Sequence, residues 1–383
     1  MNHATTAPSA AVADRLSVMF AIPELDKAGP DRVLFELLCS LDRERFAPSI
    51  MVSSDKGYYL SRLPSDVDVV IARAKRLPRY PVVEAVRAIR ERTPDVVFAT
   101  LRMTLTLGLG AFAFPRRTKL ILRQANDLTA DFAQLMQRTR IKHRIAKKVW
   151  LAALRQADAI VCQSDAMQTD LQSVGIRAPM RVIGNPVDVA AAQHAASARV
   201  ATVAGSPSLV AVGRLAAQKG HDLLLRAIAI VRATHPSIHV TIVGDGPDRA
   251  ALEELARGLG IAPNVTFAGF VAEPLPLVKV ADLFVLCSRY EGFPNAVLEA
   301  LAIGKPVVVT DCPGANAKIV TGGFNGEISP TIDERSFADA LVRAIGHRYD
   351  TGKIVEDCEA RFGARRIVGE YQDLFACTHR GRS

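Results

Sequence analysis

The sequence has no apolar run long enough to span a membrane. Its longest weakly polar stretch, residues 105–115, is shorter than the roughly 20 residues that a spanning helix needs, and Arg116 and Arg117 end it. The first fourteen residues lack both a basic start and an extended apolar stretch, so we expect a loose tail there and no signal peptide. These absences argue against an integral membrane protein.

Paired cysteines and metal-binding clusters are also absent. The six cysteines include no CxxC pair, and the eight histidines show no zinc-like spacing. Cys162, Cys287 and Cys312 lie in or beside apolar strand-like runs, where a reduced thiol behaves as a small hydrophobic group. The sequence therefore predicts a protein of a reducing compartment, the cytoplasm.

The composition that is present is that of an ordinary globular protein. Hydrophobic residues make up 49% and charged residues 23% of the 383 positions, with 25 glycines and 21 prolines. These proportions exclude a disordered chain, a collagen and a coiled coil. The length is enough for two or three domains.

Positive charge is concentrated in the first half of the chain. Residues 1–190 hold 28 Lys and Arg against 19 Asp and Glu, whereas residues 191–383 hold 20 of each. Such an asymmetry concerns binding partners and not the fold. Phosphorylated ligands, an anionic membrane surface or nucleic acid are the partner classes that it allows.

Short β-branched runs alternate with amphipathic segments along the whole chain. Near-continuous apolar runs such as LVAVG and PVVVT are typical of a parallel sheet that is buried on both faces. The predicted strands are residues 16–22, 49–53, 67–72, 95–100, 119–123, 159–164, 180–183, 208–212, 239–243, 265–267, 283–286 and 306–310. The predicted helices are residues 31–41, 82–92, 131–155, 220–233, 248–259, 295–302, 336–346 and 365–375.

This alternation occurs twice, on either side of a seam. Residues 190–207 are rich in Ala and Ser and show no strong period, as a connection would. We therefore predict an α/β protein of two doubly wound, Rossmann-like domains, residues 1–190 and 191–383. Two such domains form a cleft where the carboxyl ends of their sheets face each other, with one substrate on each. A single large α/β sheet is the alternative.

The segment VGRLAAQKG, residues 212–220, places two cations between a predicted strand and a predicted helix. Arg214 follows the strand and Lys219 stands at the entry to the helix. A guanidinium and an ammonium at the mouth of a sheet suit a diphosphate group. A solvated turn with two unrelated cations is the alternative for this segment alone.

The segment SRYEGFPNAVLEA, residues 288–300, adds two carboxylates and a helix start. Glu291 precedes the helix, Pro294 stands at its start, and Glu299 lies about one turn in. Free amides at the helix start favour a phosphate, and the carboxylates suit sugar and ribose hydroxyls. Taken singly, Glu299 has an alternative role, in which its negative charge only complements the positive end of the helix dipole.

Together these segments resemble the nucleotide-sugar domain of family 4 glycosyltransferases. The resemblance extends over most of residues 208–330, with VGDGPDRAALEEL at 243–255, VTFAGF at 265–270 and EGFPNAVLEALAIGKPVVVTD at 291–311. Weaker resemblance in the first half rests on KAGPDRVLFELL at 27–38, ADAIVCQSD at 157–165 and GNPVD at 184–188. The family has the GT-B fold, two facing Rossmann-like domains with an interdomain cleft, and transfers sugars with retention at the anomeric carbon.

The resemblance implies roles for the matching positions. Arg214 and Lys219 hold the diphosphate, Glu299 binds the ribose hydroxyls, and Glu291 contacts the donor sugar as a catalytic residue. The last helix, near residues 364–376, packs back on the N-terminal domain. Further donor-binding positions implied in the same way are Gly29, Gly244, Gly246, Gly269, Phe270, Phe293, Pro294 and Asn295.

Three positions depart from the pattern of that family. Ala28 stands where a glycine often precedes Gly29, and Lys318 stands where a glutamate is common. A histidine often found after the fifth strand is absent, and Asn126 and Asp127 are there as candidate acceptor-side residues. The donor-side roles are therefore better supported than any acceptor-side role.

We expect chemistry without a cofactor or a metal ion. Preorganised cations and amides can stabilise a departing diphosphate by several kcal/mol, so Arg214, Lys219 and the helix start at Asn295 suffice. The DxD motif at Asp66 and Asp68 begins a strand far from these residues in sequence. Double displacement with Glu291 as nucleophile and same-face attack by the acceptor both remain open, and the resemblance favours same-face attack.

Residues 138–155 form a predicted basic helix without an acidic residue. Its cations are Arg138, Arg140, Lys142, Arg144, Lys147, Lys148 and Arg155, and Ile141, Ile145 and Val149 recur at spacing four. One interpretation is a surface helix that packs this apolar row inward. The other is an amphipathic helix on anionic lipid, which suits a polyprenyl-linked saccharide acceptor and a peripheral location on the inner face of the cytoplasmic membrane. No nucleic-acid-reading motif is present.

The leading hypothesis is a retaining glycosyltransferase in cell-surface polysaccharide synthesis. It would use a nucleotide-sugar donor, with a UDP-sugar favoured and a GDP-sugar as the other option, and a glycan or lipid-linked saccharide acceptor. Rival hypotheses are a nucleotide-sugar epimerase, a sugar phosphorylase and a non-catalytic sugar-nucleotide-binding protein. A dehydrogenase is poorly supported, because no GxGxxG motif follows an early strand.

Overall fold

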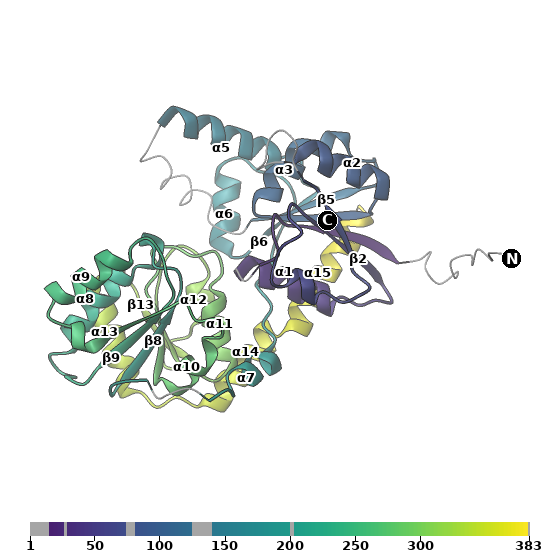
Figure 1. Ribbon diagram of the computed structural model, residues 1–383. Helices are drawn as coiled ribbons and strands as arrows, with labels where there is room; N and C mark the ends of the chain where they lie inside the picture. The colour runs from purple at the N-terminus through teal and green to yellow at the C-terminus, as the bar shows by residue number, and fades with distance from the viewer. Residues whose placement is uncertain (1–14, 27–28, 74–80, 125–139, 200–202, 382–383) are drawn as a thin grey trace.

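The computed structural model describes residues 15–26, 29–73, 81–124, 140–199 and 203–381, which form two α/β domains (Figure 1). Each domain has its own parallel sheet, with helices on both faces. The prediction of two doubly wound domains is therefore confirmed, and the alternative of one large sheet is wrong.

The first sheet has seven parallel strands in the order β3-β2-β1-β4-β5-β6-β7. Its central strands are buried along nearly their whole length, which matches their near-continuous apolar sequences. The strands are β1 (Leu16–Ala21), β2 (Phe46–Val52), β3 (Asp68–Ile71), β4 (Val96–Thr100), β5 (Lys119–Arg123), β6 (Ala159–Cys162) and β7 (Met180–Val182).

The second sheet has six parallel strands in the order β10-β9-β8-β11-β12-β13. The strands are β8 (Ser208–Val212), β9 (His239–Val243), β10 (Val265–Gly269), β11 (Leu283–Leu286), β12 (Val307–Thr310) and β13 (Gly326–Ser329). In both sheets the order reverses at one point, between β1 and β4 and between β8 and β11. Ligands of doubly wound sheets bind outside the carboxyl ends of the strands at such a switch point.

The helices of the first half are α1 (Gly29–Ser40), α2 (Val82–Arg92), α3 (Arg102–Gly110), α5 (Arg140–Leu154), α6 (Asp165–Ser173) and α7 (Val189–Ala195). Those of the second half are α8 (His221–Val231), α9 (Arg249–Gly258), α10 (Leu275–Val280), α11 (Asn295–Ala302), α12 (Asn316–Ile319), α13 (Glu334–Gly346), α14 (Thr351–Phe362) and α15 (Ala364–His379). Short 3-10 turns lie at Leu60–Arg62, Ala111–Ala113, Ala217–Lys219 and Ala262–Asn264.

The predicted strands all match observed ones, but several elements were not predicted. The sequence analysis missed β13 and the helices α3, α6, α7, α10, α12 and α14. Strand β13 is a four-residue segment, GEIS, that begins with glycine and so lacks the β-branched run on which the other strands were recognised. Most of the missed helices are short, and helix α3 has the sequence RMTLTLGLG, whose threonines and glycines are weak helix formers.

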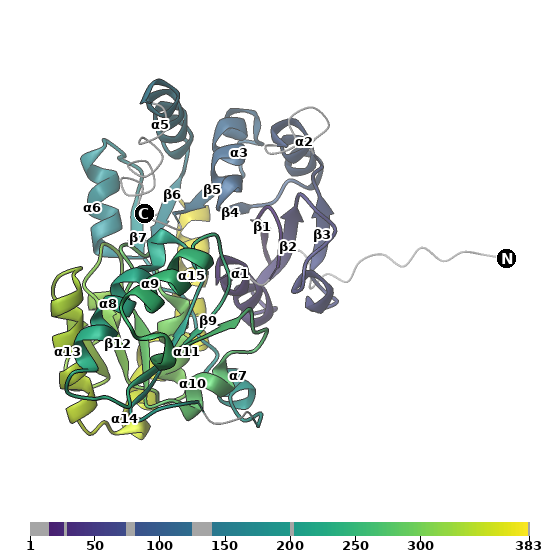
Figure 2. The same cartoon turned by 60° about the vertical axis from the view of Figure 1, so that its left-hand side comes forward.

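The boundary between the domains differs from the predicted one, and the last helix of the chain returns to the first domain. The predicted division between residues 190 and 191 falls inside α7, whose Val189 and Ala192 pack in the core of the second domain. Helix α15 runs the other way and packs on the first sheet, beside α1 (Figures 1 and 2). Its Phe375 is fully buried and makes edge contacts with the rings of Phe20 and Phe98.

The crossing of α15 predicts that the last helix stabilises the first domain. We expect Phe375→Ala to lower the free energy of unfolding of that domain by about 3–5 kcal/mol, because it leaves a cavity among buried aromatic rings. The measurement is urea denaturation followed by circular dichroism. Phe112→Ala, at a ring that is 86% exposed, is the control and should change stability by less than about 0.5 kcal/mol. Equal effects of the two substitutions would contradict the crossing.

Candidate active site

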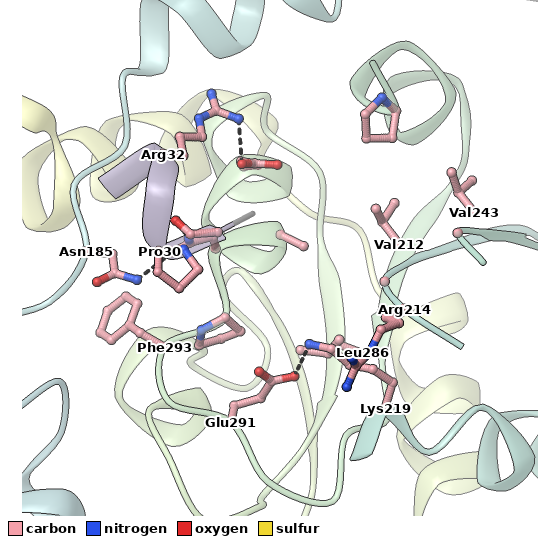
Figure 3. A pocket seen from close by; sticks show the side chains of 18 of the residues that line it. Pro30, Arg32, Asn185, Val212, Arg214, Lys219, Val243, Leu286, Glu291 and Phe293 are labelled. Atoms are coloured by element: carbon pink, nitrogen blue, oxygen red, sulfur yellow. Dashed lines mark hydrogen bonds and ion pairs between the residues drawn. The ribbon is translucent and has the colours of Figure 1, made fainter. Parts of the chain in front are cut away.

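A cavity of about 650 Å³ lies between the two domains and is lined by both. It opens at the carboxyl ends of the two sheets, where the turns after β1, β8 and β11 meet (Figure 3). The structure brings ten of the predicted site residues into its lining: Gly29, Arg214, Lys219, Gly244, Phe270, Glu291, Phe293, Pro294, Asn295 and Glu299.

The turn after β8 brings the two predicted cations into the cavity. Arg214 follows the strand, and Lys219 ends a 3-10 turn directly before α8. Backbone bonds from Gly213 to Val243 and from Leu215 to Asp245 fix this turn against the end of β9. The strand–turn–helix context that the sequence predicted for the two cations is therefore present.

Lys219 forms an ion pair with Glu291 inside the cavity. The distance from Nζ to Glu291 Oε1 is 2.6 Å, and the Ser288 hydroxyl donates to the same oxygen at 2.5 Å (Figure 3). Only 7% of the Glu291 side chain is exposed. Burial of a carboxylate costs free energy unless the group is paired and hydrogen-bonded. The contacts with Lys219 and Ser288 offset this desolvation cost for Glu291.

Glu299 is paired in the same way, but with a residue of the other domain. The Arg32 guanidinium, on α1, donates from Nη1 to Glu299 Oε1 at 2.6 Å. Burial raises the pKa of Glu299, and the positive charge of Arg32 opposes that rise. The two predicted carboxylates therefore do not stand as lone acceptors beside an anion site, because each has a cation of its own.

Arg214 is the cation of this site that stays available. Its side chain is exposed to the cavity, and among the described residues it forms no ion pair. His221, which follows the same turn, adds no charge, because burial and the nearby Lys219 lower its pKa to about 4. At neutral pH an incoming anion therefore meets Arg214 first.

The start of α11 is bonded to the first domain. Asn295 donates from Nδ2 to the carbonyl oxygen of Gly29 at 2.9 Å and accepts from Asn185 Nδ2 at 2.5 Å. Asn185 in turn accepts from the buried Arg123 at 2.7 Å and from Gln163 at 2.6 Å. A chain of polar side chains thus connects the ends of β5 and β6 to the α11 start.

Two predicted glycines lie outside the cavity lining. A side chain on Gly246 would run into the backbone of Leu215, so this glycine permits close packing of two turns. Gly269 ends β10 and accepts a backbone bond from Gly244, while its neighbour Phe270 lines the cavity and is 70% exposed. The expected roles of Gly246, to let the backbone approach the donor, and of Gly269, to flank the base, stay predictions, although neither glycine lines the cavity itself.

The acceptor-side candidates Asn126 and Asp127, and also Ala28, lie outside the described residues. Lys318, the position that departs from the pattern of the resembled family, reaches across to the first domain and pairs with Asp165 at 3.2 Å. Apart from Gly29, the sequence analysis missed the first-domain wall of the cavity, which is lined by Pro30, Arg32, Tyr58, Tyr59, Arg123, Gln163 and Asn185. Arg32 and Asn185 lie within stretches that carried the resemblance, so their motifs were a usable signal.

The DxD motif is used in surface ion pairs. Asp66 binds the guanidinium of Arg43 at 2.5 Å, and Asp68 binds that of Arg92. Both aspartates lie at or next to β3, an edge strand of the first sheet, and neither lines the cavity. Within the described part of the chain, no three His, Cys, Asp or Glu side chains are grouped to hold a metal ion.

The basic segment after residue 139 forms helix α5, as predicted from residue 140 onward. Ile145 is 59% and Val149 37% exposed, so the interpretation in which these residues pack inward is wrong. The helix buries Ala153 and Leu154 instead and packs on α3. None of the described helices is both long and apolar enough to cross a bilayer.

Two family models match the chain. The one described as Glycosyltransferase Family 4 matches residues 28–191, and the one described as Glycosyl transferases group 1 matches residues 206–347. The lipopolysaccharide core biosynthesis glycosyltransferase LpsE of Rhizobium meliloti is 28% identical over 221 residues, 58% of this chain and 62% of that protein. Mannosylfructose-phosphate synthase of Agrobacterium fabrum is 32% identical over 41% of this chain and 36% of its own length. The match thus spans less than two thirds of these curated relatives.

Solved structures share the fold over almost the whole chain. Anabaena HepE in complex with UDP superposes with a TM-score of 0.74 at 21% identity, covering 94% of this chain and all of that one. The lipopolysaccharide outer core galactosyltransferase WaaB superposes with a TM-score of 0.72 at 19% identity, covering 94% of this chain and 99% of that one. At this level of identity the likeness concerns the fold.

The turn after β9 yields a prediction about the integrity of the cavity. Gly244 has a φ of +141°, and a side chain there would collide with the carbonyl oxygen of Gly213. We expect Gly244→Ala to destabilise the second domain by about 2 kcal/mol or more, because strain and collision add. Gly258→Ala is the matched control, since nothing lies within 4 Å of its added carbon. Urea denaturation measures both, and an unchanged Gly244→Ala protein would refute this geometry.

Proposed function

The chain belongs to the family 4 glycosyltransferases and has their GT-B fold, and on that premise we propose that it transfers a sugar from a nucleotide diphosphate donor. The donor is a UDP-sugar in preference to a GDP-sugar. The acceptor is a glycan or a lipid-linked saccharide in cell-surface polysaccharide synthesis, and the anomeric configuration is retained.

One observation carries this proposal. The exposed Arg214, the Lys219 ammonium and the start of α11 all face one cavity, beside two carboxylates that can bind hydroxyls. Cations and free amides suit the charge that a diphosphate leaving group develops. HepE structures have been solved in complex with UDP and with UDP-glucose, which supports the choice of uridine for this chain.

We favour same-face attack by the acceptor over double displacement. Glu291 is our candidate for the nucleophile of a double displacement, and its Oε1 accepts hydrogen bonds from Lys219 and Ser288. Charge-assisted hydrogen bonds stabilise the carboxylate and lower its nucleophilicity. The proposed part of Glu291 is to accept a hydroxyl of the donor sugar, while Arg214 and Lys219 stabilise the departing diphosphate without a metal ion or cofactor.

An anionic membrane surface is the proposed site of action, with the enzyme peripheral on the cytoplasmic face. Helices α2, α3 and α5 lie at the end of the first domain that points away from the second domain (Figures 1 and 2). There the side chains of Leu109 and Phe112 are exposed at the end of α3, and those of Ile145 and Val149 are exposed on α5, the helix that carries Lys147 and Lys148. Exposed apolar groups beside cations suit an interface with anionic lipid.

The donor proposal predicts the effect of removing Arg214. Wild-type protein should be stabilised by UDP in a thermal-shift measurement and should release UDP from one UDP-sugar of a panel. Arg214→Ala should lose the thermal shift and lower the rate of UDP release by about 100- to 1000-fold, because the leaving group loses a preorganised cation. Arg257→Ala, in an exposed ion pair on α9, is the control and should behave as wild type.

Other outcomes of this experiment distinguish the rival functions. An epimerase would convert the donor without releasing UDP, and a phosphorylase would need inorganic phosphate. A non-catalytic binder would shift in melting temperature without any turnover. No shift with any nucleoside diphosphate would contradict the proposed donor site itself.

The membrane proposal predicts binding to anionic vesicles. In flotation, wild-type protein should rise with vesicles that contain phosphatidylglycerol and not with phosphatidylcholine alone. Lys147→Gln with Lys148→Gln should weaken that binding about 30-fold, since each cation near the surface contributes about 1 kcal/mol. Lys279→Gln with Lys353→Gln, in the second domain, is the charge-matched control. Equal recovery with both kinds of vesicle, unaffected by either pair, would leave α5 a purely structural helix.

A further inference from the structure

The ion pair between Arg32 and Glu299 joins the two domains across the cavity. Arg32 belongs to the first turn of α1 and Glu299 to the second turn of α11, and both line the cavity. Their side chains are 28% and 17% exposed. In Figure 3 the Arg32 guanidinium points across the cleft to a carboxylate of the facing helix. The pair is therefore part of the cavity wall and not of the outer surface.

A second contact, one turn away, draws the same two helices together. Asn295 donates to the Gly29 carbonyl oxygen, and a side-chain carbon on Gly29 would lie 2.9 Å from the Asn295 amide nitrogen. Gly29 is three residues before Arg32, and Asn295 is four residues before Glu299. The first turns of α1 and α11 thus lie against each other with two matched contacts, which close the first domain on the second.

Under the proposed function, the ion pair with Arg32 involves a carboxylate that also binds the donor. Glu299 is the carboxylate proposed to bind the ribose hydroxyls, and one of its oxygens is already held by Arg32. A ribose diol that takes both oxygens of this carboxylate competes with the guanidinium for Oε1.

Arg32 has other acidic groups within electrostatic reach when it leaves Glu299. Glu36 lies one turn further along α1, and Glu273 lines the same cavity. Burial raises the pKa of Glu36 and the charge of Arg32 opposes that rise. Glu299, Tyr59, Glu36 and Glu273 together raise the pKa of Arg32 against the effect of its own burial. The Arg32 guanidinium therefore keeps its charge, and Glu36 and Glu273 are the alternative carboxylates that can attract it.

We propose that Arg32 is a positioning residue that holds Glu299 and closes the first domain while the donor site is empty, and that it yields this carboxylate to the ribose when the donor binds. This inference rests on the proposed role of Glu299 in donor binding. Its consequence is that Arg32 opposes the binding of ligands that contain ribose and does not oppose the binding of a bare diphosphate.

Isothermal titration calorimetry with two probes, UDP and inorganic pyrophosphate, tests this inference. In Arg32→Met the Kd for UDP should fall about threefold to tenfold, since a competing ion pair worth about 1 kcal/mol is gone. The Kd for pyrophosphate should change by less than about twofold. The Met side chain keeps much of the apolar stem of Arg32, and Arg32→Gln replaces it if the Met variant does not fold.

Lys318→Met is the matched control. It removes the other ion pair between the domains, Lys318 with Asp165, in which the side chains are 46% and 77% exposed and neither residue lines the cavity. Its Kd values for both probes should equal those of wild type. A gain in UDP affinity in Lys318→Met would show that any loosening of the domains has this effect, and would overturn the specific role of Arg32.

Two further variants separate competition from simple packing. Arg32→Lys keeps the charge and should restore a Kd for UDP close to that of wild type. In a Glu299→Gln background, Arg32→Met should no longer tighten UDP binding, because the carboxylate for which Arg32 and the ribose compete is absent. With a UDP-sugar, Arg32→Met should lower the KM for the donor without raising kcat, since the domain closure is weakened.

An unchanged or weaker affinity of Arg32→Met for UDP would overturn the inference. Arg32 would then be either a plain structural contact or a direct ligand of the donor. Failure of the proposed function has a different signature, because wild type and every variant would then bind no nucleoside diphosphate.

Discussion

Charge balance inside the cavity between the domains is the constraint on which the rest of this site depends. Two carboxylates with little exposed surface face the cavity, and neither is tolerable there without a cation. Lys219 pairs with Glu291 within the second domain, whereas Arg32 reaches Glu299 from the first domain. Arg214 lines the same cavity, is exposed, and forms no ion pair among the described residues, so it is available to an entering anion.

The fold supplies these groups by its topology. Each sheet reverses its strand order once, and the turns at the two reversals bring Gly29, Arg214 and Glu291 to one place. The long α15 packs on the first sheet, while α7 packs in the core of the second domain. Because α15 returns to the first domain, the chain connects the two domains twice.

The sequence predicted the second-domain wall of the cavity far better than the first-domain wall. Arg214 follows an apolar strand, and Lys219 and Glu291 lie in the turns between such strands and the next helices, so their position near the strand ends could be deduced from local order. The Arg32–Glu299 pair joins positions 267 residues apart, and no local pattern indicates such a contact. Periodicity also failed at α5, where the row of Ile145 and Val149 faces outward. Spacing shows that residues share a helix face, but it does not show what that face meets.

A structure of the protein with UDP, from crystals soaked with a chelator present, tests the account most directly. The account predicts diphosphate oxygens within about 2.7–3.2 Å of the side-chain nitrogens of Arg214 and Lys219. It also predicts ribose hydroxyls on the Glu299 carboxylate, with the Arg32 guanidinium withdrawn from it. A diphosphate held elsewhere, a requirement for a divalent ion, or a ribose bound while Arg32 still holds Glu299 would contradict it.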